Sequence, residues 1–176
     1  MAWTVIDHTE LSSTTSSWAE ASISSSYDHL LLEGSIRSAA VANWQNLWIR
    51  VGNGGLDTGS NYSSIYLTNV NSSSLSAGRA TGQTKWAYQY TAAAAFMANG
   101  FSSVRIWLPN YANTTGYKQA IIETGLVMNS TSTSYSSLTR TAGLWASTSA
   151  ITDLEVSEPN AGHVQYSSFT LYGITA

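Results

Sequence analysis

The stretch that decides the fold is FSSVRIWLPN, residues 101–110. Val104, Ile106 and Leu108 occupy alternate positions in it. A period of two is typical of a β-strand that presents one face to an apolar core. Pro109 ends the pattern, because proline has no backbone N–H to donate to a neighbouring strand. We expect this segment to be a central strand of a β-sandwich.

The rest of the chain repeats short alternating segments that are separated by turn residues. We predict strands at residues 3–6, 18–23, 29–37, 46–51, 62–67, 85–90, 117–128, 138–145, 151–156 and 169–174. Residues 69–79 and 130–137 are rich in Ser and Asn or Thr and are expected to form an exposed loop and a turn. Only residues 92–97, AAAAFM, have helical propensity. The prediction is an all-β, jelly-roll-like antiparallel β-sandwich of about eight strands, with at most one short helical turn.

The length of 176 residues suits a single domain with a sizeable core. No composition shift or linker divides the chain, so we expect one β-sandwich domain over residues 1–176. Residues 1–10 are a candidate N-terminal arm, which would reach out from that domain.

The composition limits the partners. Charged residues make up 10% of the chain, against about 25% in ordinary soluble domains. Lys85 and Lys118 are the only lysines and the five arginines are scattered, so we expect no nucleic-acid partner. The chain has no cysteine and no apolar run long enough to span a membrane, and we expect no secretory signal. A neutral, Ser/Thr-rich surface on a protein that is not exported fits a component made in a host cytoplasm and released in a particle by lysis.

No motif for catalysis or for cofactor binding is present. His8, His29 and His163 are far apart in sequence, which gives no reason to group them at a metal or nucleophilic site. Asp153 and Glu155 share a strand face and would form a glycosidase pair only across a cleft, whereas a solvated strand face is the simpler interpretation. The Asp-x-Gly sequence at residues 57–59 could contribute to a calcium site, but an Asx-turn is the simpler interpretation. We therefore expect no enzymatic activity, no cofactor and no metal.

Tryptophans are the candidate interface residues. Trp48 and Trp107 alternate with core-facing residues in their strands, so both should point outward and need a cover. Arg105 shares the face of Trp107. Trp44 and Trp86 complete the candidate set. The alternatives for these aromatic side chains are burial between subunits, a sugar-stacking platform and ordinary packing within the chain.

Four segments resemble small Ser/Thr-rich structural proteins of tailed bacteriophages, especially those of marine bacteria and cyanobacteria. They are residues 49–51 with 57–63 (IRV and DTGSNYS), 106–111 (IWLPNY), 142–152 (AGLWASTSAIT) and 169–174 (FTLYGI). The resemblance covers residues 10–175 and implies a jelly-roll-like virion component, often trimeric, without a catalytic motif. The loop at residues 52–57 is longer here than the turn that is typical of the pattern.

The resemblance implies a capsid decoration (cement) protein. Such a protein would form a homo-oligomer, with a trimer favoured, bind the major capsid protein or tail proteins, and lie on the capsid exterior of the virion. The alternative is a tail-fibre or carbohydrate-binding module for host recognition. A glycan-degrading enzyme is the third and weakest hypothesis.

Overall fold

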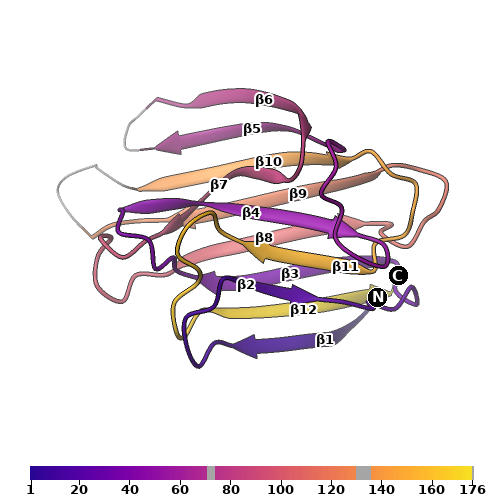
Figure 1. The fold of residues 1–176 in the computed structure, drawn as a ribbon, viewed down its shortest axis with the longest axis horizontal. Coiled ribbons are helices and arrows are strands. Elements are labelled where there is room, and N and C mark those ends of the chain that lie inside the picture. Colours follow the sequence, from indigo (N-terminus) through magenta and orange to yellow (C-terminus); the bar gives the residue numbers. More distant parts are fainter. Residues whose placement is uncertain (71–73, 130–135, 176) are drawn as a thin grey trace.

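A computed structural model describes residues 1–70, 74–129 and 136–175. It shows two antiparallel β-sheets packed on one core (Figure 1). The large sheet has the order β1 (Ala2–Glu10), β12 (Ser168–Thr175), β3 (His29–Ile36), β8 (Ser102–Pro109), β9 (Lys118–Leu126), β10 (Ser137–Trp145), β5 (Tyr62–Val70) and β6 (Ser76–Gln83). The small sheet has the order β2 (Ser17–Glu20), β11 (Asp153–Ser157), β4 (Trp44–Gly52) and β7 (Trp86–Ala92). The predicted all-β sandwich is confirmed.

The stretch FSSVRIWLPN forms β8, which lies inside the large sheet between β3 and β9. Val104, Ile106 and Leu108 are at most 2% exposed and belong to the main core, as the alternation predicts. In the neighbouring strand β3, Leu30 and Leu32 also enter this core. Leu31 points to the opposite face and is nevertheless buried, while Glu33 and Ser35 on that face are exposed.

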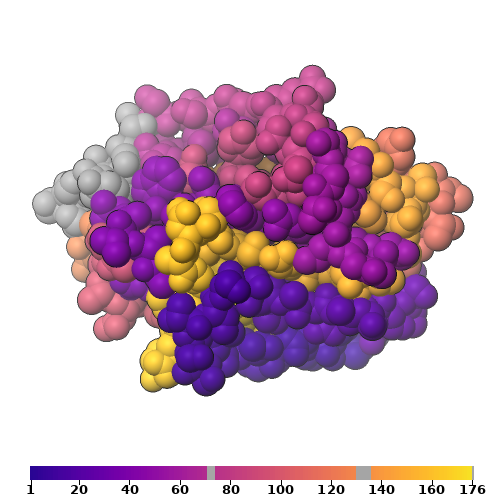
Figure 2. All heavy atoms as spheres, in the orientation of Figure 1, coloured from indigo at the N-terminus to yellow at the C-terminus, as the bar shows by residue number. Residues whose placement is uncertain are grey.

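The jelly-roll arrangement stays a prediction, and two hairpins extend the large sheet of the sandwich. The small sheet packs over the middle of the large one, where β7 contacts β9, β10 and β5, and the chain passes repeatedly between the two layers. The consecutive pairs β5–β6 and β9–β10 both join the large sheet beyond β8. The large sheet is therefore twice as wide as the small one, and β6 lies at its outer edge (Figures 1 and 2).

The first ten residues do not project as an arm. Residues 2–10 form β1, which pairs with β12 at one edge of the large sheet from Ala2–Thr175 to Glu10–Ser168. The two ends of the chain consequently lie beside each other (Figure 1). Trp3 packs edge-on against Tyr172 of β12, with ring centroids 5.7 Å apart.

Three sequence-based expectations need correction or completion. The described residues contain twelve strands, more than the eight expected, and β6 occupies part of the predicted loop 69–79. Most of the predicted turn at 130–137 lies outside the described residues. The Ala-rich segment 92–97 forms turns, and no helix is found in the part of the chain that the structure describes.

The Ala-rich segment is held by partners elsewhere in the chain. The N–H groups of Ala94 and Ala95 donate to the carbonyls of Ala40 and Ala42. The guanidinium of Arg37 donates to the carbonyl oxygens of residues 94, 97 and 100 at 2.9–3.1 Å. These contacts satisfy backbone groups that a helix would have paired internally, so the propensity of alanine does not decide the conformation.

The core position of Val104 gives a testable prediction. Val104→Ala removes two buried methyl groups from β8 and should lower the free energy of unfolding by about 2 kcal/mol. Val41→Ala is the matched control, because Val41 is 96% exposed and should leave stability nearly unchanged. Urea unfolding followed by tryptophan fluorescence measures both, and equal midpoints for the two variants would contradict the core assignment.

Candidate interaction face

The three histidines lie at separate places and have different partners. His8 is hydrogen-bonded through Nδ1 to the hydroxyl of Thr170 at 2.8 Å. His29 accepts a hydrogen bond from the backbone N–H of Asn110. His163 is buried, its Nε2 lies 3.1 Å from the Val156 carbonyl, and burial lowers its pKa. None of these contacts brings two histidines together.

The carboxylates singled out in the sequence hold loops and strands in place. Asp153 accepts hydrogen bonds from the N–H of Gly55 at 3.0 Å and from the neighbouring Thr152 hydroxyl. Glu155 forms an ion pair with Arg50 at 3.6 Å. Within the described residues, no three His, Asp or Glu side chains are grouped so that they could hold a metal ion.

Asp57 forms the predicted Asx-turn. Its Oδ1 accepts the N–H of Gly59 at 2.7 Å, while Oδ2 accepts from the Asn61 amide at 2.8 Å and from the Trp145 indole at 2.7 Å. Burial raises the pKa of this carboxyl, but the three hydrogen bonds outweigh burial and hold the pKa below its ordinary value. The side chain therefore anchors the β4–β5 connection to the end of β10.

Trp86 is wrongly predicted as an interface residue. It is 0% exposed and packs at right angles on Tyr62, with ring centroids 5.3 Å apart. Its indole N–H donates to the carbonyl of Leu144, and the ring lies so close to Gly143 that a Cβ there would clash with it. A register shift in the β4–β7 pairing breaks the strict alternation, so that Trp86 and Gln89 both face inward.

Trp48 and Trp44 point away from the main core but are covered within the chain. The ammonium of Lys85 lies 4.1 Å from the Trp48 ring centroid, and the Arg50 guanidinium lies 5.9 Å away. Both are cation–π distances. Trp44 packs against Tyr90 at 4.5 Å, next to a small second cluster. For these two tryptophans, packing within the chain already supplies much of the cover.

Trp107 lies on the outer face of the large sheet, which the small sheet does not cover. It belongs to one registered row that crosses all eight strands. In strand order the row is Val5, Tyr172, Leu31, Trp107, Ile121, Ala142, Ile65 and Arg79. Seven of its eight members are apolar or aromatic. Val5 and Ile65 are 54% and 58% exposed. We call these residues the apolar row.

Arg105 lies in the next row along the strands, where the charges alternate in sign. The order across β3, β8, β9 and β10 is Glu33, Arg105, Glu123 and Arg140. Glu33 pairs with Arg105 at 3.4 Å, and Glu123 pairs with Arg140 at 3.3 Å. We call these four residues the charge ladder. Its ion pairs are solvent-exposed, so within a single chain they contribute little to stability.

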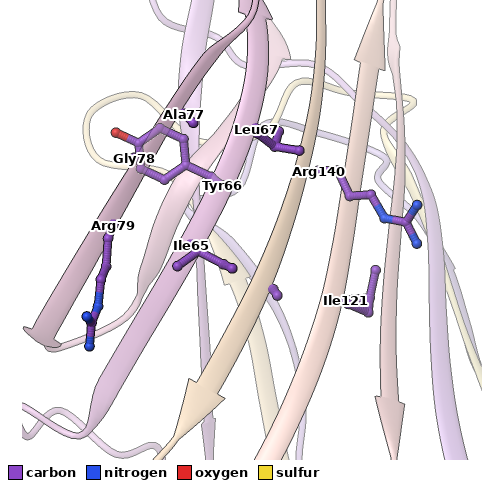
Figure 3. A pocket seen from close by; sticks show the side chains of 9 residues that line it. Ile65, Tyr66, Leu67, Ala77, Gly78, Arg79, Ile121 and Arg140 are labelled. Carbon is purple, nitrogen blue, oxygen red and sulfur yellow. The ribbon is translucent and has the colours of Figure 1, made fainter.

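Beside the ladder, the outer face is hollowed at β5, β6, β9 and β10. Figure 3 shows Ile65, Leu67 and Arg140 on neighbouring strands around this hollow of about 580 Å³. Its lining is mainly apolar. Ile65 and Leu67 are about half exposed, and Ala142 contributes only a methyl group between Ile65 and Ile121. The face therefore combines a bulky aromatic half around Trp107 with a recessed aliphatic half.

Sequence reasoning located two members of this face and missed the rest. Arg105 and Trp107 were visible because they alternate with core residues in one strong strand. The ladder partners and Ile65 come from strands distant in sequence, and their alignment depends on the pairing register. The alternation of positive and negative charges across the four strands could not be predicted from the separate segments.

Comparisons with protein-family models, curated proteins and solved structures find no match. The described part of the chain has no helix with the length and hydropathy of a membrane span.

The different positions of Trp86 and Trp48 give a second prediction. Trp86→Ala should lower the free energy of unfolding by about 3–5 kcal/mol, because it empties a fully buried site. Trp48→Ala removes a partly exposed ring and its cation–π contact and should cost about 1 kcal/mol. Chemical unfolding compares the two variants. If Trp86→Ala were the milder change, the core assignment of Trp86 would be incorrect.

Proposed function

We propose that this protein is a structural component of a bacteriophage virion, most simply a capsid decoration protein that self-associates and stabilises the shell. One observation carries the proposal: on the outer face of the large sheet the apolar row is only partly covered by the described chain, with Leu31 buried but Val5 and Ile65 more than half exposed. Large apolar patches on a soluble protein mark sites of contact with other proteins. The sequence resemblance to phage structural proteins supplies the virion context.

The side chains available for chemistry also favour a structural role. The conspicuous carboxylates among the described residues, Asp57, Asp153 and Glu155, are engaged in turns and ion pairs. The neutral, Ser/Thr-rich exterior suits a particle component that works by shape and buried area. In this proposal the protein binds only the assembled shell, and binding to the assembled state shifts the equilibrium away from disassembly.

A host-recognition module is the second candidate, and the aromatic half of the same face favours it. Trp3 packs on Tyr172 at one end of β12, and Trp107 packs on His29 at 5.0 Å. Exposed aromatic rings beside polar side chains can stack on sugar rings while the polar groups bind hydroxyls. In this alternative the protein would sit in a few copies at the tail and bind a cell-surface glycan.

Localisation on the virion tests the proposal. A decoration protein should co-sediment with intact capsids in many copies, and particles that lack it should burst at a lower temperature or under milder osmotic shock. Low-dose imaging of whole particles would show it on the shell. A few copies confined to the tail, together with retention on host glycans, would replace the first function by the second.

Trp107→Ala adds a residue-level prediction. Removing this ring from the apolar row should reduce self-association, and with it incorporation into particles, by at least about tenfold if Trp107 is a central anchor. Trp48→Ala is the matched control on the opposite surface and should be incorporated normally. Quantitative gel analysis of purified particles gives both values. Equal incorporation of the two variants would remove Trp107 from the assembly surface.

A further inference from the structure

We propose that two copies of this chain pair face to face through the outer faces of their large sheets, about a two-fold axis that runs along the strands between β8 and β9. This proposal rests on the proposed function, in which the protein self-associates. The partner that binds the outer face is a second copy of the same chain. It is carried by the order of charges in the ladder and by the shape of the apolar row.

The charge ladder is self-complementary under this rotation. A two-fold axis parallel to the strands reverses the order of the strands in the facing sheet and leaves the row at the same height. Glu33 then faces the partner's Arg140, and Arg105 faces the partner's Glu123. The remaining two contacts repeat these by symmetry, so all four facing pairs have opposite charge. Two-fold interfaces require this kind of self-complementary patch.

Only some orders of four charges have this property. With two negative and two positive groups, the first must oppose the fourth in sign, and the second must oppose the third. The observed order, negative–positive–negative–positive, meets both conditions. The order negative–positive–positive–negative would also form two ion pairs within each chain, but it would place like charges opposite each other between chains.

The apolar row is complementary in size under the same rotation. Trp107 faces the partner's Ile121, Leu31 faces the partner's Ala142, and Tyr172 faces the partner's Ile65. The bulky half of one sheet therefore meets the recessed half of the other. The hollow of about 580 Å³ beside Ile65 (Figure 3) lies where the partner's Tyr172 would project, whereas Leu31 is buried among its own neighbours.

The available area suits a specific interface. Eight strands spaced about 4.8 Å apart make the face about 34 Å wide. Three rows of outward side chains occupy about 20 Å along the strands, which gives on the order of 700 Å² per chain. Stable protein interfaces bury about 800 Å² per partner. Packing of one sheet on another also accommodates the twist of both sheets.

The two rows have different roles in the pairing. Burial of Trp107, Tyr172 and Ile65 supplies the favourable energy, as aromatic and aliphatic anchors do at most interfaces. The ladder selects the register and the two-fold orientation, because any slip by one strand places like charges opposite each other. In the third row Ser35, Ser103 and Gly125 are small, and the exposed Leu138 of one chain would face the partner's Ser35.

Double charge exchanges separate this interface from the ion pairs within each chain. E123R/R140E keeps the net charge and keeps a Glu–Arg pair within each half of the ladder, but it creates the order negative–positive–positive–negative. The variant should fold normally and should lose pairing, with a dimer dissociation constant raised at least about tenfold by like-charge contacts. R105E/E123R gives negative–negative–positive–positive, which places like charges next to each other within the chain and stays complementary between chains. It should pair.

Mixing two non-pairing variants provides a rescue. E33R/R105E creates the order positive–negative–negative–positive and should also be monomeric alone. Facing E123R/R140E, every ladder position then meets an opposite charge. An equimolar mixture of the two should therefore form a heterodimer, although neither variant forms a homodimer. A surface disturbed for unrelated reasons would not recover in this way.

Sedimentation equilibrium of the wild-type chain and the three double variants, at low salt, is the experiment, with circular dichroism as the check of folding. The wild-type protein should have twice the 18.9 kDa mass of one chain. A monomeric or trimeric wild type, or undiminished pairing of E123R/R140E, would overturn the two-fold pair. A monomer present in many copies on capsids would overturn the two-fold pair and leave the decoration of the shell intact. A dimer absent from virions would support the pair and overturn the decoration role.

Discussion

The alternation of side chains along a β-strand is the constraint on which the rest of this structure depends. Each residue that a strand of the large sheet commits to the core places its neighbours on the outer face. Val104, Ile106 and Leu108 fill the sandwich, and Arg105 and Trp107 are consequently held on the other side by the same backbone. The chemistry of the outer face is therefore fixed with nearly the same precision as the packing of the core.

The unequal size of the two sheets turns this constraint into a functional surface. Four strands cover one side of the eight-stranded sheet, and the pairs β5–β6 and β9–β10 widen it beyond β8. Two of the four ladder charges, Glu123 and Arg140, belong to the added pair β9–β10. Without these pairs the face would end at Trp107, and the charge order that permits a two-fold partner would not exist.

The sequence was informative where the determinants are local. Alternation in single segments predicted the all-β class, the central position of residues 101–110 and the outward direction of Trp107. It failed for Trp86, because a register shift between β4 and β7 is set by pairing partners that the segment itself does not contain. It failed for β6, whose Ser/Gly-rich sequence forms a strand because β5 offers it hydrogen-bonding partners. The ladder required the register of four strands at once and was beyond any reading of separate segments.

The pairing of β1 with β12 has a mechanical consequence. The first and last strands are antiparallel neighbours, and Ala2 lies opposite Thr175 where both ends of the chain leave the sheet. A pulling force applied between these ends acts across the hydrogen bonds at one end of the pair, so it opens them one after another as a zipper opens. The domain should therefore yield at low force when it is held by its termini. A load applied across the sheet faces would instead be shared by many strands at the same time.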